Sequence, residues 1–265
     1  MAKKSTHKPD FINSEELTKN LKTEIIGKKI YFFEKIPSTN LYAKQLIKEC
    51  AQEGTIVIAD IQTSGRGRKN RIWYSPPGGL WLSVILYPEI CPKSGMLITM
   101  TVSISVAQAI KEITGLDPEI KWPNDLLLKE KKICGILTEI NADFNKIKYA
   151  IVGIGINVNN EIDEDLKNIA FSLKQELGSE VSRIKLLSSI LKNLDNNYKK
   201  LIQKNYNYIE KTWISFTKMI DRKVQITDEK NVIVGIVKDI DENGHLIIES
   251  KFGEMKIVSG DIKYL

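Results

Sequence analysis

The apolar residues of this chain change their spacing near Asp221, and this change limits the folds that the chain can adopt. Between residues 183 and 219 they recur at the spacing of an amphipathic helix. After Asp221 the chain consists of short alternating segments, and Asn243-Gly244 is a strong hairpin-turn signal between two of them. A segment of this length built from short strands has the size of a small barrel of the SH3 kind. The pattern therefore predicts an α+β protein that ends in an SH3-like domain over residues 221–265.

The region before the helical segment mixes strands with helices. Alternating or β-rich segments predict strands at residues 28–36, 55–62, 80–87 and 148–159. Residues 119–128 and 132–140 flank a charged turn, which predicts a hairpin. Helices are predicted over residues 41–52, ended by Gly54, and over residues 94–114. Together these elements predict a mixed β-sheet with flanking helices over residues 28–220. Residues 1–27 would form an N-terminal extension with a short helix at 13–22.

Residues 63–79 form a long loop between two predicted buried strands. Connections longer than about 12–15 residues without structure of their own are usually binding loops, lids or disordered segments. The loop contains TSGRGRKNR (63–71), whose glycines let the backbone approach a ligand and whose arginines are forked donors for phosphate or carboxylate. On its own the motif is equally compatible with a solvated mobile loop. A nucleic-acid-binding arm is disfavoured, because strands hold both ends of the loop.

Five short motifs follow one another along the chain: STN (38–40), GRGRKNRIW (65–73), KWPND (121–125), KICGILTE (132–139) and GIGINVN (153–159). In this order and spacing, the sequence resembles a biotin protein ligase (biotin–[acetyl-CoA-carboxylase] ligase) from about residue 28 onward. The resemblance implies an enzyme that activates biotin with MgATP as biotinyl-5′-AMP. Such an enzyme then transfers biotin to a lysine of a biotin carboxyl carrier domain.

The resemblance implies a first set of residues that contact biotin. Ser38, Thr39 and Asn40 would contact its ureido and ring end, although such residues at a predicted helix start also serve as N-caps. Gly153 and Gly155 would allow close backbone approach. The complete set is Ser38, Thr39, Asn40, Gln62, Gly65, Arg66, Arg68, Lys132, Gly135, Gly153 and Gly155.

A second implied set contacts the nucleotide. Trp73 would stack on adenine, and core packing is the alternative for this side chain. Mg²⁺ would be held through the substrate phosphates, with Asn124 and Asp125 as candidate ligands; a turn hydrogen-bonding role is the alternative for that pair. The complete set is Arg68, Arg71, Trp73, Lys121, Asn124, Asp125, Lys132 and Asn157.

Three residues, Lys132, Arg66 and Arg68, would carry the chemistry. Lys132 matches the lysine that contacts the reacting carboxylate and the α-phosphate, where a cation lowers the repulsion between the two anions. A solubilising lysine in a charged turn is the alternative for this residue. Arg66 would meet both anions, and Arg68 would hold the loop shut over the adenylate. The resemblance thus implies a mobile cationic flap that folds over the substrates.

The sequence departs from the family pattern at Asn70, Cys134 and Leu265. Asn70 replaces a usual glycine, and Asn tolerates left-handed backbone better than most residues. Cys134 replaces a small residue and is interpreted as a small buried thiol rather than a nucleophile. Leu265 stands where relatives with this ending commonly have an arginine near the nucleotide, and Lys263 is the candidate substitute.

Composition and net charge limit the partners and the location that can be expected for the protein. The net charge of +6 and the sequence pI near 9.0 are compatible with an anionic ligand, an acidic carrier or nucleic acid. The longest weakly apolar stretch, residues 96–110, contains Thr, Ser and Gln and is interpreted as too short to span a bilayer. The three cysteines, which form no C-x-x-C motif, favour reduced thiols and a cytoplasmic location.

Two other functions are considered. A lipoate or octanoate ligase on a related fold is disfavoured by the complete GRGR loop. A biotin-responsive DNA-binding repressor is disfavoured because about 27 residues before the resemblance are too few for a winged helix, which favours a monofunctional form. We therefore expect no nucleic-acid or membrane partner, and we expect a homodimer that pairs through the edge of the catalytic sheet, as relatives often do.

Overall fold

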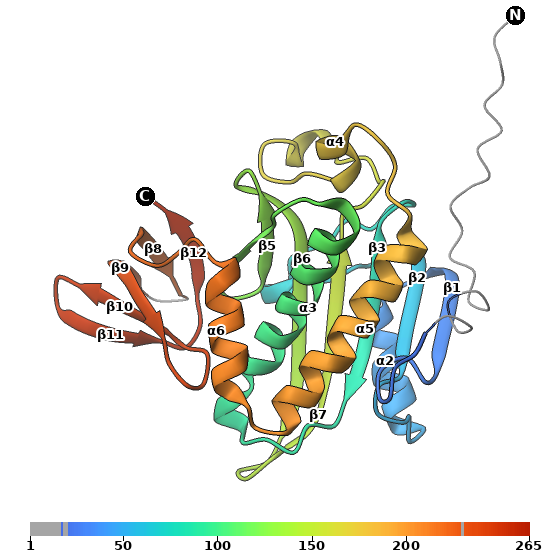
Figure 1. Ribbon diagram of the computed structural model, residues 1–265, viewed down its shortest axis with the longest axis horizontal. Helices are drawn as coiled ribbons and strands as arrows, with labels where there is room; N and C mark the ends of the chain where they lie inside the picture. Colours follow the sequence, from blue (N-terminus) through green and yellow to red (C-terminus); the bar gives the residue numbers. More distant parts are fainter. Residues whose placement is uncertain (1–16, 18–20, 229–230) are drawn as a thin grey trace, which may run out of the picture.

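The computed structural model describes residue 17, residues 21–228 and residues 231–265. The helix predicted at residues 13–22 lies largely outside this described part. The main body is a seven-stranded sheet in the order β1-β2-β3-β7-β6-β5-β4 (Figure 1). β1 and β2 are parallel and the other neighbours are antiparallel, so the predicted mixed sheet is confirmed. The strands are β1 (Ile30–Ile36), β2 (Ile56–Gln62), β3 (Leu80–Leu86), β4 (Glu119–Lys121), β5 (Asp125–Leu128), β6 (Lys131–Ala142) and β7 (Ile147–Ile156).

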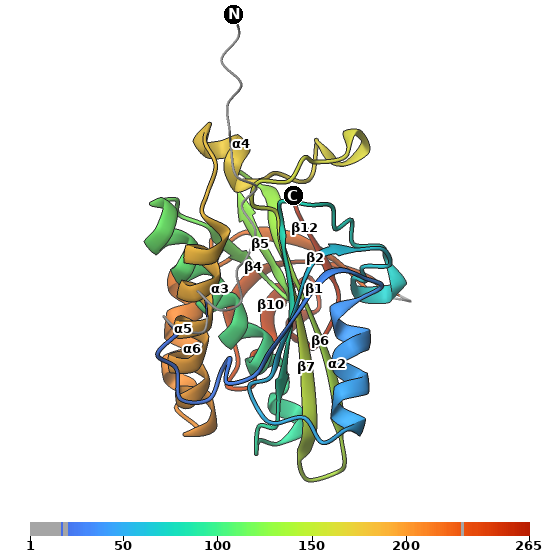
Figure 2. The ribbon, with the colours of Figure 1, turned by 90° about the vertical axis from the view of Figure 1, so that its right-hand side faces the viewer.

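Helices cover both faces of this sheet (Figure 2). Helix α2 (Thr39–Lys48) lies on one face, where Ala43 and Leu46 pack against residues of β2, β3 and β7. Helices α3 (Met96–Thr114), α5 (Arg183–Ile202) and α6 (Tyr206–Phe216) cover the opposite face. Because β3 is covered on both sides, its residues are buried without alternation. A short helix, α4 (Leu173–Leu177), lies above this body in Figure 1.

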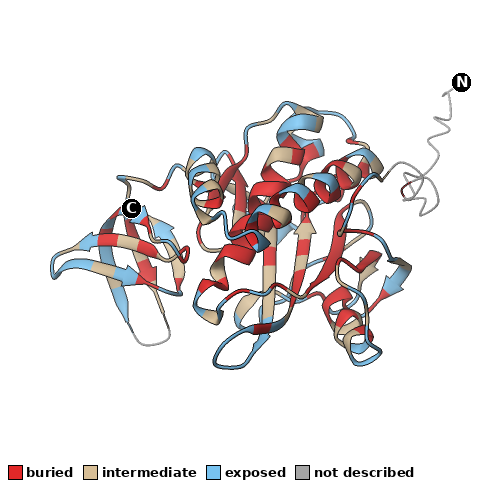
Figure 3. Cartoon of the chain, turned by 60° about the horizontal axis from the view of Figure 1, so that its bottom comes forward, coloured by how far each residue is buried: buried red, intermediate tan, exposed pale blue. Residues whose placement is uncertain are grey.

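The central helix α3 is buried without interruption over residues 97–107 (Figure 3). By length and composition alone, Pro92–Thr114 is long and apolar enough to cross a membrane, so the prediction that this stretch is too short is wrong. However, 72% of the qualifying window is buried inside the protein. Two of its hydroxyl side chains are satisfied within the helix: those of Thr101 and Ser105 each donate to the carbonyl four residues earlier, at 2.7 Å. These bonds let a helix with Ser and Thr lie in an apolar core.

Three sequence predictions need correction. The first helix ends at Lys48, before Gly54; a Cβ at Gly54 would lie 2.0 Å from the carbonyl oxygen of Ile25, so this glycine serves a close backbone approach. The single long helix predicted over 183–219 is broken at Lys204, whose φ is 58°, and α6 begins after it. The segment predicted as one strand at 119–128 turns back on itself, giving the antiparallel strands β4 and β5.

The C-terminal part is a five-stranded antiparallel sheet in the order β11-β10-β9-β8-β12. Strand β12 was not predicted from the sequence. In the described residues no pairing joins the edge strands β11 and β12, so the sheet is open and the SH3-like barrel remains a prediction. The strands are β8 (Lys223–Thr227), β9 (Val232–Ile240), β10 (Leu246–Ser250), β11 (Gly253–Ile257) and β12 (Asp261–Tyr264).

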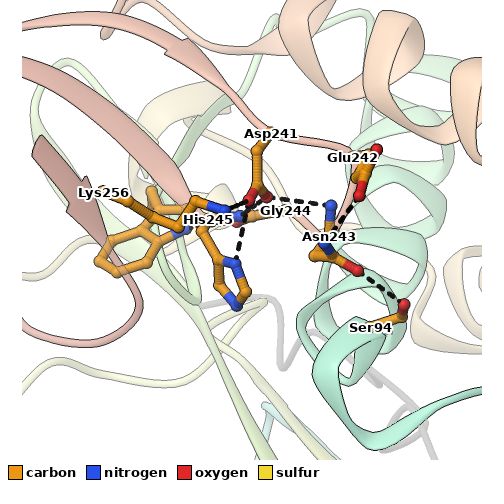
Figure 4. A network of polar contacts seen from close by, with 8 residues as sticks. Ser94, Asp241, Glu242, Asn243, Gly244, His245 and Lys256 are labelled. Carbon is orange, nitrogen blue, oxygen red and sulfur yellow. Dashed lines mark hydrogen bonds and ion pairs between the residues drawn. The ribbon is translucent and has the colours of Figure 1, made fainter. Parts of the chain in front are cut away.

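The hairpin turn between β9 and β10 joins the two sheets (Figure 4). Asp241 organises the turn by accepting hydrogen bonds from the backbone N–H groups of Asn243 and His245, at 2.9 and 2.8 Å. The turn then contacts the main body, because the Oγ of Ser94 donates to the Asn243 side chain at 2.9 Å. The indole N–H of Trp122 likewise donates to the Gly244 carbonyl at 3.0 Å. The buried tryptophan of the KWPND motif therefore helps to fix the small sheet in place.

Candidate active site

One cavity of about 530 Å³ opens between the loop at residues 63–79, the glycine-rich ends of β6 and β7, the β4–β5 turn and residues 162–170. Every residue that the sequence predicted for the site lines this cavity, with the exception of Gly65. Gly65 is buried at the base of the loop, where an added Cβ would lie 2.3 Å from the carbonyl oxygen of Trp73. The structure therefore gives Gly65 a supporting place in the loop and brings the other predicted residues together.

One end of the cavity is lined by neutral side chains that belong to a hydrogen-bond network. The Oγ of Ser83 on β3 lies within hydrogen-bond distance of Thr39 Oγ1, at 2.7 Å, and of Asn40 Oδ1, at 2.6 Å. The Nδ2 of Asn40 donates in turn to Glu139 at 2.8 Å. The Oγ1 of Thr39 donates to Gln62 Oε1 at 3.1 Å. These bonds fix the side chains relative to one another, so this end of the cavity is organised before any ligand arrives.

The start of α2 is capped in a way that the sequence did not predict. Ser38 is the N-cap residue, but its side chain makes no capping hydrogen bond. Instead, the backbone N–H of Thr39 donates to Gln62 Oε1 at 2.9 Å. The side-chain capping role considered for Ser38 is therefore wrong, and Gln62 from the end of β2 ties the helix start to the sheet. The buried Ser38 side chain lines the cavity.

The floor of the cavity is made of glycines. Gly135 on β6 and Gly155 on β7 are directly opposite each other in the sheet, and the indole of Trp73 lies on both. An added Cβ would fall 2.9 Å from the Trp73 ring at Gly135 and 2.3 Å from Trp73 Nε1 at Gly155. At Gly153 it would fall 2.4 Å from Asn40 Oδ1. Each glycine thus leaves room for a predicted site residue.

The indole N–H of Trp73 is buried and has no hydrogen-bond partner within the described part of the chain. A buried donor without an acceptor costs roughly 1–3 kcal/mol. The ring itself is partly exposed and lines the cavity, and it packs edge-on against Trp81 at 6.4 Å between ring centroids. Both interpretations of Trp73 therefore have structural support: the ring packs against the protein, and its polar atom is left for a ligand or water to satisfy.

The other end of the cavity is cationic. Lys132 Nζ lies 2.7 Å from Asp125 Oδ1 and 5.1 Å from the centre of the Trp73 ring. The Lys132–Asp125 contact is an ion pair that lacks hydrogen-bond geometry, since Asp125 Oδ1 is buried without a hydrogen bond. Burial lowers the pKa of the nearby Lys121, with Asp125 acting in the opposite direction. The remaining cations that line the cavity are Arg66, Arg68 and Arg71.

The cationic loop has more structure than the sequence suggested. Isolated bridges pair Gln62 with Ser75 and Arg66 with Ile72, and Arg68–Asn70 form a short 3₁₀ turn. Asn70 has a φ of 59°, the left-handed conformation for which Asn is better suited than most residues. Arg68 donates to Asn124 Oδ1 at 3.1 Å and to the Gly260 carbonyl at 3.4 Å. The loop is therefore an irregular hairpin that rests on both sheets.

The described residues offer few ligands for a metal ion that would be bound without substrate. No group of three or more His, Cys, Asp and Glu side chains in the described residues could hold a metal ion. Of the two candidate ligands, Asn124 already binds Arg68 through its oxygen and the Ile136 carbonyl through its nitrogen, at 3.1 and 2.9 Å. Asp125 contributes one carboxylate beside Lys132. This donor set fits Mg²⁺ that arrives on substrate phosphates and keeps several waters.

Sequence reasoning missed several residues that line the cavity or support the side chains that line it. Ser83 and Glu139 lie within strands, and polar residues inside apolar segments carry no local turn or motif signal. The segment 162–171 was given no role, although the backbone of Lys132 pairs with it through Ile169 and Phe171 at 2.8 and 2.9 Å. Asp261 lines the cavity, whereas the exposed Lys263, the candidate substitute for a C-terminal arginine, does not. Cys134 is buried as predicted, and burial raises the pKa of its thiol.

Comparison with known proteins agrees with this geometry. Residues 32–157 match the Biotin/lipoate A/B protein ligase family, and residues 219–263 match the biotin protein ligase C-terminal domain. The bifunctional ligase/repressor BirA of Bacillus subtilis is 36% identical over 260 residues, which are 97% of this chain and 80% of that protein. The biotin–[acetyl-CoA-carboxylase] ligase of Paracoccus denitrificans is 27% identical over 78% of this chain and 88% of its own length.

Solved structures give the same result. The biotin protein ligase from Aquifex aeolicus in complex with biotin and ATP matches with a TM-score of 0.78 and 32% identity, over 90% of this chain and 99% of that one. The chain therefore belongs to the biotin/lipoate A/B protein ligases, a family of ligase enzymes. Within that family, the C-terminal domain match and the 36% identical relative place it with the biotin protein ligases.

Proposed function

We propose that this chain activates biotin with ATP as biotinyl-5′-AMP and transfers biotin to a lysine of a biotin carboxyl carrier domain. The observation that carries the proposal is the division of one cavity into a neutral hydrogen-bonding end and a cationic end. Biotin is a neutral ring system that carries a carboxylate, and this carboxylate has to lie next to the polyphosphate of ATP. A cavity with one neutral and one cationic end suits this pair of ligands. The glycine floor gives both ligands room to lie against the sheet.

In the first step a carboxylate oxygen of biotin attacks the α-phosphorus of ATP, the bond to the bridging oxygen breaks, and pyrophosphate leaves. The two reacting groups are anions, and two unit charges at 4 Å repel each other by about 4 kcal/mol at an effective dielectric constant near 20. Lys132, Arg66 and Arg68 line the same cavity and would offset this repulsion. In the second step the carrier lysine attacks the acyl carbon and AMP leaves.

Mg²⁺ would enter with ATP and neutralise phosphate charge. Asp125 is the described carboxylate best placed to meet it, because Asp125 lines the cavity beside Lys132. Arg71, Lys121 and Asn157 line the same cavity and would contact the nucleotide. Their side chains position the nucleotide rather than exchange protons with it, so orientation and electrostatics would supply most of the rate.

Biotin-dependent exchange of pyrophosphate into ATP tests the first step. We expect the wild-type protein to catalyse this exchange and Lys132→Ala to lower its rate by at least about 100-fold, the scale for removing one charge-stabilising group. Lys131→Ala is the matched control, because Lys131 belongs to the same turn and donates instead to the Lys167 carbonyl at 2.9 Å. Wild-type exchange in Lys132→Ala would contradict the role given to this lysine.

Calorimetry with biotin, lipoate and octanoate tests the choice of acid. Of the three acids, we expect only biotin to bind measurably. The network of Thr39, Asn40 and Ser83 offers several hydrogen-bonding groups that the apolar chain of octanoate cannot use. Tighter binding of lipoate or octanoate would redirect the assignment to a different acyl substrate on the same fold.

The remaining expectations concern partners and location. We propose a homodimer that pairs through an edge of the seven-stranded sheet, where β1 and β4 are the outer strands, and sedimentation would test it. The curated relative from Bacillus subtilis is named a ligase and a repressor; for this chain we propose the ligase activity without DNA binding, which a gel-shift assay with biotin and ATP would test. We also propose a cytoplasmic location, in keeping with the free thiols of the described cysteines.

A further inference from the structure

The last strand, β12, connects the C-terminal sheet to the cavity at several points. The hydroxyl of Tyr264 donates to Glu119 on β4, and Lys121 Nζ lies 5.0 Å from the centre of the Tyr264 ring. Immediately before the strand, the carbonyl of Gly260 accepts a hydrogen bond from Arg68 at 3.4 Å. One short strand therefore touches both the KWPND motif and the cationic loop.

Between these contacts, Asp261 faces the loop. Its Oδ2 accepts hydrogen bonds from Lys69 Nζ at 3.2 Å and from the guanidinium of Arg71. The side chain is 32% exposed and lines the cavity. Burial alone would raise the pKa of Asp261, but hydrogen bonds from Arg71 and Lys69 outweigh it and hold the pKa below its ordinary value. Asp261 is therefore an anion in neutral solution, paired with two loop cations.

The loop needs such an anchor for a simple electrostatic reason. It carries Arg66, Arg68, Lys69 and Arg71 within six residues, and these like charges repel one another when the loop rests on the cavity. Asp261 offsets part of that repulsion from a fixed position. The strand that bears it is paired along its length with β8, and the small sheet is joined to the main body through the Asn243-Gly244 turn.

We propose that Asp261 is a positioning residue that holds the cationic loop over the cavity through Lys69 and Arg71. Closure of the loop then depends on the C-terminal sheet, even though the loop belongs to the catalytic domain. The consequence for catalysis rests on the proposed function: the anchor retains the adenylate between the two steps. Asp261 does not touch the reacting atoms, so its removal should affect retention more than the activation step.

Trypsin tests the anchor without reference to activity, because the four loop cations are cleavage sites. We expect Asp261→Asn to speed cleavage within residues 66–71 by about fivefold to tenfold, the range for losing a partly exposed pair of charge-assisted hydrogen bonds. Asp261→Glu should stay within about twofold of wild type, because it keeps the carboxylate. Glu254→Gln is the control: it removes one negative charge from exposed β11 of the same sheet.

Retention of preformed biotinyl-adenylate tests the consequence. We expect Asp261→Asn to release it about fivefold to tenfold faster, while pyrophosphate exchange at saturating substrates stays within about threefold of wild type. Lys69→Ala should raise the release rate less than Asp261→Asn, because Arg71 still pairs with Asp261, and it should add little in an Asp261→Asn background, where the partner of Lys69 is already gone. Thermal unfolding of each variant shows whether the C-terminal sheet remains folded.

The proposal that Asp261 anchors the loop is overturned if Asp261→Asn and Glu254→Gln give equal trypsin cleavage rates, or if the effects of Asp261→Asn and Lys69→Ala on adenylate release are fully additive. A different failure concerns the proposed function: a wild-type protein without biotin-dependent exchange would refute that function, and the trypsin result would still decide the anchor.

Discussion

Replacing Gly155 with alanine should disturb ligand binding far more than the fold. The new Cβ would fall 2.3 Å from Nε1 and 2.6 Å from Cε2 of Trp73, well inside the optimal separation of about 3.5–4.0 Å. Overpacking of this kind costs roughly 1–3 kcal/mol when it cannot relax. Here it can relax, because Trp73 belongs to a loop and can leave the glycine floor while β7 keeps its pairing. The displaced indole would then occupy ligand space.

We therefore expect Gly155→Ala to weaken biotin binding by about 10- to 100-fold, since each 1.4 kcal/mol is about one factor of ten. The thermal midpoint should fall by only a few degrees. Calorimetry measures the affinity, and Gly67→Ala is the matched control, because a Cβ at Gly67 meets nothing closer than 3.6 Å. In a Trp73→Ala background the added methyl group should have little further effect. Unchanged biotin affinity in Gly155→Ala would refute the role of the glycine floor.

Three further expectations concern other parts of the molecule. Arg68→Gly removes the hydrogen bonds to the β4–β5 turn and to Gly260 before β12, so adenylate should escape faster and label bystander lysines; labelling at the wild-type level would contradict the role of Arg68 in holding the loop shut. Iodoacetamide should modify the exposed Cys50 and Cys91 in the native protein, and mass spectrometry should find Cys134 unmodified, because it is buried and its thiol pKa is raised. Burial alone would raise the pKa of Asp241, but hydrogen bonds to its carboxylate lower it to about 2. Its stabilising effect is thus present above the unfolded pKa of about 3.9 and is lost as the pH falls through about 2. Denaturation between pH 4 and 2 should show a smaller loss of stability in Asp241→Asn than in wild type.

The sequence predicted the structure correctly where it depends on residues that are close together in the chain. Strands β2 and β3 follow from short β-rich apolar runs, and α3 follows from a long apolar segment that ends at a left-handed Gly115. The gathering of the predicted site residues around one cavity follows from the order of the motifs, which places them at the ends of neighbouring strands and in the turns between them. Such features depend on neighbours in the chain and can be predicted from them.

Other features depend on contacts between distant segments and could not be predicted. The break in the C-terminal helices lies at Lys204, a residue type with no turn preference, in a sequence whose apolar spacing continues across it. Gln62 caps a helix that begins 23 residues earlier in the chain. Asp261 meets Arg71 across 190 residues, and no local pattern marks a carboxylate whose partners lie in another domain.

The two ends of the cavity are held in different ways, and this difference bears on how the enzyme would work. The neutral end is built from β3, α2 and the end of β2, which belong to one core and satisfy one another with hydrogen bonds. It is formed before a ligand binds. The cationic end joins a loop with two left-handed residues to a strand of the C-terminal sheet. Because like charges meet there, that end gains most from the arrival of anions. A preformed site for the neutral ring and an assembled site for phosphate favour binding of biotin before nucleotide.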